Sequence, residues 1–177
     1  LMNMVTRMRS CAVLVLPMIL AGSLVSVGSA AGDSGSAKAF FAGGCFWCME
    51  EVFEKVPGVT SVTSGYMGGR VENPSYEQVS AGGTGHAESV EVVYDPAKVS
   101  YTTLLDTFWH NVDPVTPNAQ FCDHGSQYRS VIFYQTEQQQ DLAEESKRAI
   151  EQSGRLHKPI VTELTMASTF YPAEDYH

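Results

Sequence analysis

Apolar residues recur along the chain with two periods, and each period predicts a different kind of element. Alternating or β-branched-rich runs, typical of strands, occupy residues 39–42, 59–66, 88–94, 127–134 and 160–166. Apolar residues at helical spacing occupy residues 46–53, 100–112 and 136–152, and Ser75 with Gln78 forms a capping-box pair before a short helix. We expect residues 113–121 to be a loop and residues 170–177 to be an aromatic tail with no element of its own.

The order of these elements predicts an α+β fold. Strand, helix, strand, strand, helix, strand, helix, strand is typical of a two-layer sandwich in which helices cover a mixed or antiparallel sheet. The expected plan is ferredoxin-like, with a split β-α-β unit. At 177 residues and 44% hydrophobic content, the chain suits one domain with a substantial core.

The first residues have the pattern of a secretory signal. Arg7 and Arg9 precede an apolar run at residues 11–27 that ends in the small residues 28–31. We expect residues 1–31 to be cleaved, residues 32–38 to be a flexible leader, and residues 39–177 to form the domain. A transmembrane anchor is the weaker interpretation, because Pro17 interrupts a run that is already short. The protein should therefore be exported, to a periplasm or outside the cell, with no stable membrane insertion after cleavage.

Charge narrows the range of partners. A formal net charge of −9 and the lack of a lysine or arginine stripe argue against nucleic acid as a partner.

The candidate chemistry is concentrated in residues 43–50, where two thiols and two aromatic rings follow a glycine pair. Cys45 is expected at a helix N-terminus, where the dipole and free backbone N–H groups should lower the thiol pKa. Cys48 lies one helical turn further, so the pair could cycle between dithiol and disulfide. A general dithiol–disulfide oxidoreductase and a zinc-stabilised binding module using Cys122 and His124 as further ligands are the alternatives. Inert core cysteines would be a third explanation.

Two other places suggest a site. Alternation in the strand at residues 88–94 puts Glu88 on the same face as Val90 and Val92, so either a positive partner holds this carboxylate or its pKa is raised. Cys122, Asp123 and His124 come just before the strand predicted at residues 127–134, at a loop end typical of functional residues.

Four separated motifs resemble the peptide methionine sulfoxide reductase A family. They are Gly44-Cys45-Phe46-Trp47, Gly85-His86-Ala87-Glu88, residues 123–130 (Asp-His-Gly-Ser-Gln-Tyr-Arg-Ser) and residues 170–174 (Phe-Tyr-Pro-Ala-Glu). The resemblance covers residues 40–177.

The resemblance implies a role for each matched residue. Cys45 is the nucleophile, Phe46 and Trp47 form an apolar wall for the substrate methyl group, and the pocket is completed by Glu88, Tyr76, Asp123 and Tyr128. Glu88 would be the acid that protonates the sulfoxide oxygen, and the tyrosines would be neutral donors. The implied activity is reduction of methionine S-sulfoxide, free or in proteins, by a monomeric enzyme that binds no organic cofactor or metal and is recycled by a thioredoxin-like donor.

The chain departs from the commonest form of that family. Many members have glycine in place of Cys48 and resolve the oxidised nucleophile with cysteines near the C-terminus, which do not occur before His177. The family segment usually continues beyond this point, so we expect the sequence to be truncated there. Cys48 and Cys122 together resemble a subgroup, which implies that they are resolving or relay thiols.

Overall fold

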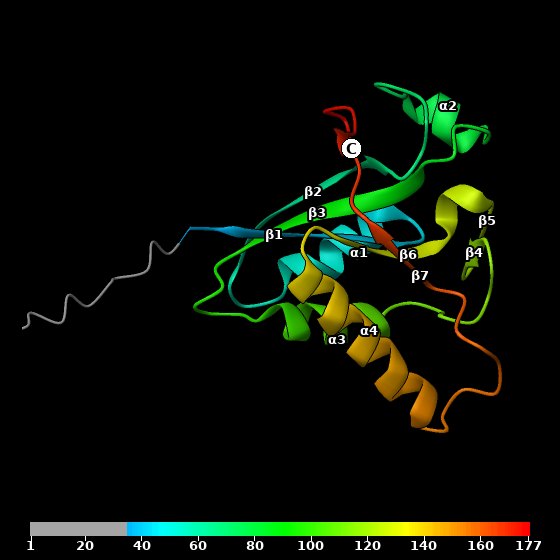
Figure 1. The fold of residues 1–177 in the computed structure, drawn as a ribbon. Coiled ribbons are helices and arrows are strands. Elements are labelled where there is room, and N and C mark those ends of the chain that lie inside the picture. The colour runs from blue at the N-terminus through cyan, green and yellow to red at the C-terminus, as the bar shows by residue number, and fades with distance from the viewer. Residues whose placement is uncertain (1–34) are drawn as a thin grey trace, which may run out of the picture. The chain divides into compact units, whose positions relative to one another are not determined.

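A six-stranded sheet forms the centre of the computed structural model, which describes residues 35–177 (Figure 1). The strand order is β7-β6-β1-β3-β2-β8, and all neighbours are antiparallel except the parallel pair β6 and β7. The strands are β1 (Ala37–Gly43), β2 (Val59–Met67), β3 (Ala87–Tyr94), β6 (Ser130–Tyr134), β7 (Glu163–Met166) and β8 (Tyr171–Pro172). A separate two-stranded hairpin consists of β4 (Ala119–Gln120) and β5 (Asp123–His124).

Four helices contribute to a core on one face of the sheet. The helices are α1 (Phe46–Glu54), α2 (Tyr76–Ser80), α3 (Tyr101–His110) and α4 (Glu137–Gln152). Each places buried residues in the cluster that contains Val90 and Val92 of β3, with α2 contributing Val79. Aromatic rings fill this layer, with Phe41 of β1 stacked on Phe53 of α1 at 4.9 Å between ring centroids. The opposite face carries a smaller cluster covered by Ala167 and Phe170, which belong to the C-terminal segment.

The prediction of an α+β fold with helices on a mainly antiparallel sheet is confirmed. The finer ferredoxin-like plan stays a prediction, although β3 does lie between β1 and β2, the two strands that α1 connects. Strand β1 begins at Ala37, two residues before the predicted start, because Ala37 already pairs with Tyr94.

Three predictions about single elements were wrong. The predicted strand 127–134 begins only at Ser130, because Ser126–Tyr128 form a 3-10 turn in which the Gln127 side chain donates to Ser80 O. The predicted loop 113–121 contains β4, and its hairpin turns through Phe121 at a φ of 51°. The last predicted strand is shorter, beginning at Glu163.

The aromatic tail also differs from the prediction, because it adds β8 to the sheet edge. Pro172 pairs with Gly65 and Tyr171 pairs with Tyr66. This close approach depends on Gly65, because a side chain there would collide with the Phe170 ring and with the Tyr171 carbonyl.

The predicted signal at residues 1–31 lies outside the described residues. Within residues 35–177, none of the helices has the length and apolar character needed to cross a membrane.

Candidate active site

A glycine turn places Cys45 at the start of α1. Strand β1 ends at Gly43, the chain turns at Gly44 with a φ of 93°, and Cys45 is the N-cap residue whose carbonyl accepts from the amide of Cys48 at 3.1 Å. A Cβ atom on Gly44 would lie 2.6 Å from Cβ of Gln120, so only glycine fits the turn without displacement. The predicted strand, glycine turn and helix around the thiol are confirmed.

Burial raises the pKa of the Cys45 thiol, in contrast to the predicted lowering. The amide N–H groups of Cys48 and Trp47 do act to lower this pKa, as a helix N-terminus should, but loss of hydration outweighs them. The nearby Cys48 and Glu88 add to the rise. The Cys45 thiol is therefore protonated at neutral pH.

One cavity of about 220 Å³ gathers all seven residues that the sequence predicted for the reaction and for substrate binding. Its lining consists of Cys45, Phe46, Trp47, Tyr76, Glu88, Asp123 and Tyr128. These residues come from α1, α2, β3, β5 and the 3-10 turn, so distant parts of the chain converge on the thiol.

Glu88 places a buried carboxyl group in the wall of this cavity. Its residue is only 2% exposed, and its Oε2 accepts from the amide of Phe46 at 3.1 Å. Burial, assisted by the negative charge of Asp123, raises the pKa of Glu88 to about 7 against the opposing effect of that amide. Among residues 35–177 the ion pairs do not include Glu88. Of the two alternatives for this carboxyl, the raised pKa is therefore confirmed.

Tyr128 complements Glu88 as a neutral donor. Burial, followed by the charge of Glu88, raises the pKa of Tyr128 to about 12, so its hydroxyl stays protonated across the physiological range. The cavity therefore offers a hydroxyl and a carboxyl that is half protonated near neutrality, both close to a thiol.

The aromatic wall continues into the C-terminal segment. Phe46 is buried whereas Trp47 is 52% exposed, and their ring centroids are 6.2 Å apart. The imidazole of His177 packs against both, at 5.0 Å from Phe46 and 5.6 Å from Trp47. It also lies 4.7 Å from the ring of Tyr76.

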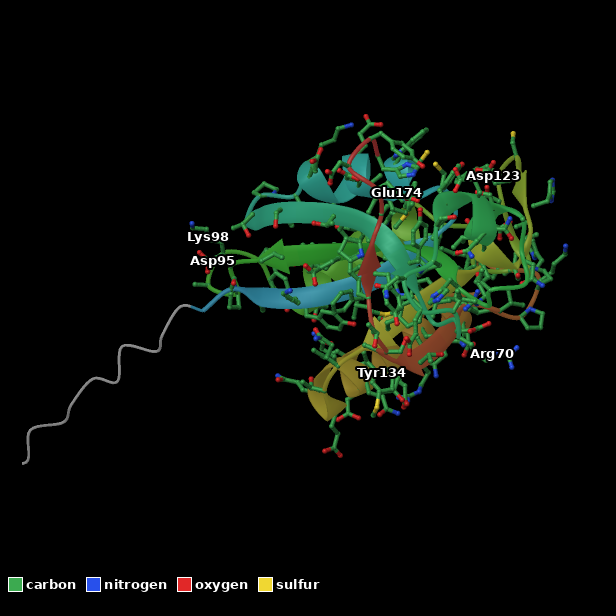
Figure 2. The ribbon with its side chains drawn as sticks, turned by 90° about the horizontal axis from the view of Figure 1, so that it is seen from above. Arg70, Asp95, Lys98, Asp123, Tyr134 and Glu174 are labelled. Atoms are coloured by element: carbon green, nitrogen blue, oxygen red, sulfur yellow. The ribbon has the colours of Figure 1, made fainter. Side chains whose placement is uncertain are left out.

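Sequence reasoning missed three residues next to this wall: Tyr66, Glu174 and His177. Glu174 lies on the C-terminal segment (Figure 2). Its carboxylate accepts from the Tyr66 hydroxyl at 3.0 Å and from the Tyr76 amide at 2.8 Å. The only sequence signal was the family-like motif at residues 170–174, because a tail without apparent periodicity gives no reason to place it at a site.

A second cavity of about 370 Å³ brings together the three cysteines of the described chain. Cys45, half-buried, lines it together with the exposed Cys48 and Cys122, and all three are free thiols. The cavity shares Cys45 and Asp123 with the first one. Cys48 and Cys122 thus line a cavity together with Cys45, and their roles as resolving or relay thiols stay a prediction.

The alternative zinc site is not assembled. Within residues 35–177, no three His, Cys, Asp or Glu side chains lie together as possible metal ligands.

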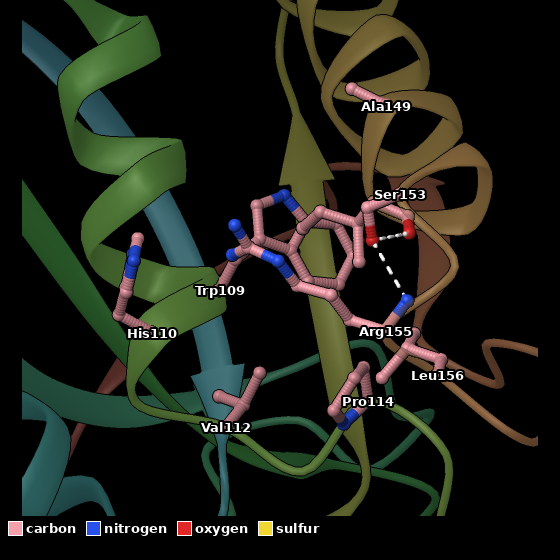
Figure 3. A pocket seen from close by; sticks show the side chains of 9 residues that line it. Trp109, His110, Val112, Pro114, Ala149, Ser153, Arg155 and Leu156 are labelled. Atoms are coloured by element: carbon pink, nitrogen blue, oxygen red, sulfur yellow. Dashed lines mark hydrogen bonds between the residues drawn. The ribbon is translucent and has the colours of Figure 1, made fainter.

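A further cavity of about 460 Å³ lies apart from the predicted residues, between the C-terminal ends of α3 and α4 (Figure 3). Its lining is mainly apolar, with Trp109, Val112 and Ile150, and the only charged side chain is that of Arg155. It contains neither a thiol nor a carboxyl group, so it has no part in the chemistry of Cys45.

Comparisons with known proteins agree with the geometry. A family model described as peptide methionine sulfoxide reductase matches residues 37–177. The peptide methionine sulfoxide reductase MsrA of Listeria innocua is 52% identical over 140 residues, which cover 79% of each chain. The crystal structure of reduced Mxr1 from Saccharomyces cerevisiae superposes with a TM-score of 0.76 at 28% identity, covering 82% of this chain and 84% of that one. Mxr1 in complex with Trx2 gives a TM-score of 0.59 at 20% identity, with 81% and 85% covered.

Proposed function

The chain belongs to the peptide methionine sulfoxide reductase family, and from this premise we propose that it reduces methionine S-sulfoxide, free or in proteins, to methionine. The observation that carries the proposal is the cavity in which the Cys45 thiol shares a wall with Glu88, a carboxyl group whose pKa is about 7. A sulfoxide sulfur becomes electrophilic when its oxygen accepts a proton, so a thiolate beside a protonated acid is the arrangement this reaction needs.

The first half-reaction assigns a role to each wall of the cavity. Phe46 and Trp47 bind the methyl group of the substrate. Tyr76 and Tyr128 donate hydrogen bonds to the sulfoxide oxygen. Asp123 accepts a hydrogen bond from the substrate backbone or from water in the cavity. The sulfur of Cys45 attacks the substrate sulfur while Glu88 delivers a proton to the sulfoxide oxygen. That oxygen then transfers as a hydroxyl group to the Cys45 sulfur, the substrate S–O bond and the transient S–S bond both break, and methionine leaves with its sulfur lone pair. The oxygen finally resides on Cys45 as a sulfenic acid, so the substrate gains two electrons and Cys45 loses two.

The second half-reaction restores Cys45. A thiol of Cys48 or Cys122 condenses with the sulfenic acid, forming a disulfide and releasing water. A thioredoxin-like dithiol then reduces that disulfide, so the enzyme needs no bound cofactor. The shared cavity of the three cysteines supports this order of events, and the solved complex of yeast Mxr1 with Trx2 supports the class of donor.

The decisive assay uses purified protein with dithiothreitol and, in separate reactions, each epimer of a blocked methionine sulfoxide. We expect the S epimer to be consumed and the R epimer to persist, and Cys45→Ser to be inactive. The exposed Cys48 and Cys122 would also suit a general dithiol–disulfide oxidoreductase. If neither epimer is consumed while a protein disulfide is reduced, that alternative replaces our proposal.

We also propose that the protein is exported and acts as a monomer. Arg7, Arg9 and the apolar run at residues 11–27 support export. Sequencing the N-terminus of the mature protein should show cleavage after Ala30 or Ala31, and an intact N-terminus would contradict export. Light scattering coupled to size exclusion should give the mass of one chain.

A further inference from the structure

One carboxylate connects the C-terminal segment to two other elements beside the substrate cavity. The Oε2 atom of Glu174 accepts from the hydroxyl of Tyr66 at 3.0 Å, and its Oε1 atom accepts from the amide of Tyr76 at 2.8 Å. The imidazole Nε2 of His177 lies 3.4 Å from the same Oε2. None of these contacts joins the carboxylate to the reacting thiol, so Glu174 does not touch the chemistry directly.

The two tyrosines that bind Glu174 differ in how firmly the fold holds them. Tyr66 is fully buried within β2, whereas Tyr76 is the first residue of α2, a helix of only five residues. A helix this short has little intrinsic stability, so contacts from other segments determine where it lies. Ser75 caps α2 locally, but Glu174 provides a hydrogen bond to the Tyr76 amide from 98 residues away in sequence.

Glu174 is itself held in place through the backbone. Pairing of Pro172 with Gly65 and a hydrogen bond of 2.9 Å from the Ala173 amide to Ser64 O attach the C-terminal segment to β2. The side chain of Tyr76 lines the substrate cavity, and its ring packs against Phe46 with centroids 6.3 Å apart. The position of this cavity wall is therefore linked, through Glu174, to the edge of the sheet.

We propose that Glu174 is a positioning residue that holds Tyr76 against the substrate cavity by linking the Tyr76 amide to the buried hydroxyl of Tyr66. This role rests on the proposed reductase function, because it concerns where the Tyr76 hydroxyl meets the sulfoxide oxygen. Displacement of a donor by about 1 Å can cost on the order of a hundredfold in rate.

Two variants of Glu174 should behave differently. Glu174→Gln retains an oxygen for the Tyr76 amide and an NH₂ group that the Tyr66 hydroxyl can accept from, so we expect kcat/KM with dithiothreitol within about threefold of wild type. Glu174→Ala removes both contacts and should lower kcat/KM about tenfold to a hundredfold. Most of this loss should fall on kcat, with KM changing less than about threefold, because the hydroxyl acts on charge that develops in the transition state.

A double variant separates positioning from a purely structural role. Glu174→Ala leaves the buried Tyr66 hydroxyl without a partner, and Tyr66→Phe removes that hydroxyl as well. In Tyr66→Phe/Glu174→Ala we expect urea stability to return toward wild type while kcat stays low. Recovery of kcat together with stability would overturn the proposal, because Glu174 would then serve only to satisfy Tyr66.

A double-mutant cycle with Tyr76→Phe tests the route of the effect. If Glu174 acts by placing the Tyr76 hydroxyl, adding Glu174→Ala to Tyr76→Phe should lower kcat less than about twofold further. A full additional loss would overturn the proposal and indicate that Glu174 acts through His177 instead. Failure of wild type to reduce either epimer refutes the proposed function, whereas an active wild type matched by Glu174→Ala refutes only this inference.

Discussion

Replacing Glu88 by glutamine should stabilise the fold at alkaline pH while it slows the reaction. The physical cause is burial, which holds the pKa of Glu88 at about 7 instead of its ordinary 4.5. Glutamine has nearly the same shape, and its oxygen can still accept from the Phe46 amide that lies 3.1 Å from Glu88. The variant therefore removes the charge and the transferable proton with little change in packing.

The expected size of the stabilisation follows from the two pKa values of Glu88. Below pH 4.5 the carboxyl is protonated in both the unfolded and the native state, so it adds no pH dependence to folding. Between pH 4.5 and 7 the unfolded chain loses this proton while the native state retains it, so the wild-type free energy of unfolding falls as pH rises. Above pH 7 Glu88 is ionised in both states, and its burial lowers the wild-type free energy of unfolding by the full amount. At 1.36 kcal/mol per pKa unit, this loss of stability is about 3 kcal/mol.

Urea unfolding of both proteins at pH 4 and at pH 8.5, with a reductant present, measures this penalty. At pH 8.5 the free energy of unfolding of Glu88→Gln should exceed that of wild type by about 3 kcal/mol more than it does at pH 4. In single-turnover assays the variant should form methionine about 100-fold to 10,000-fold more slowly, the usual contribution of a general acid. A stability difference independent of pH would refute the raised pKa, and an unchanged rate would move the proton-donor role to a tyrosine.

Other variants test the thiols and the turn that presents them. Cys45→Ser should lose turnover, with less than about a tenth remaining, and keep its unfolding free energy within about 0.5 kcal/mol. Cys48→Ser should release one equivalent of methionine, turn over poorly with thioredoxin and recover with dithiothreitol, whereas Cys122→Ser should show a milder defect; the reverse pattern would make Cys122 the first resolving thiol. Gly44→Ala should destabilise the protein by about 1–3 kcal/mol in urea unfolding, because φ is 93° and the new Cβ would lie 2.6 Å from Cβ of Gln120; a neutral change would mean that the turn relaxes.

The parts of the site that local patterns specify could be predicted from the sequence. Alternation along β3 was enough to place Glu88 on the buried, helix-facing side, because side-chain direction in a strand follows a period of two. The glycine turn before Cys45 likewise marked the end of β1 and the start of α1. The family resemblance implied roles for Tyr76, Asp123 and Tyr128, which periodicity alone could not assign to one cavity.

Features that depend on distant contacts could not be predicted in this way. The expected lowering of the Cys45 pKa was wrong because the helix N-terminus is a local feature, whereas the burial that outweighs it comes from the surrounding fold. The role of Glu174 depends on β8 pairing with β2, which brings residue 174 to residues 66 and 76. Two residues of pairing produce no readable alternation, so the tail gave no strand signal.

The raised pKa values of Cys45 and Glu88 determine how the reaction should depend on pH. Between pH 7 and the higher pKa of Cys45, the pair holds one proton, mostly on sulfur, and the reactive arrangement with a thiolate and a protonated Glu88 is a minor tautomer of that state. Because both tautomers carry one proton, their ratio does not change with pH. Below pH 7 the pair gains a second proton, so the single-turnover rate should rise about tenfold from pH 6 to pH 8 and then level off. The single-turnover rate of Glu88→Gln should not show this rise between pH 6 and pH 8. A wild-type rate that instead fell as the pH rose through 7 would contradict the prediction and show that the thiol attacks without first giving up its proton.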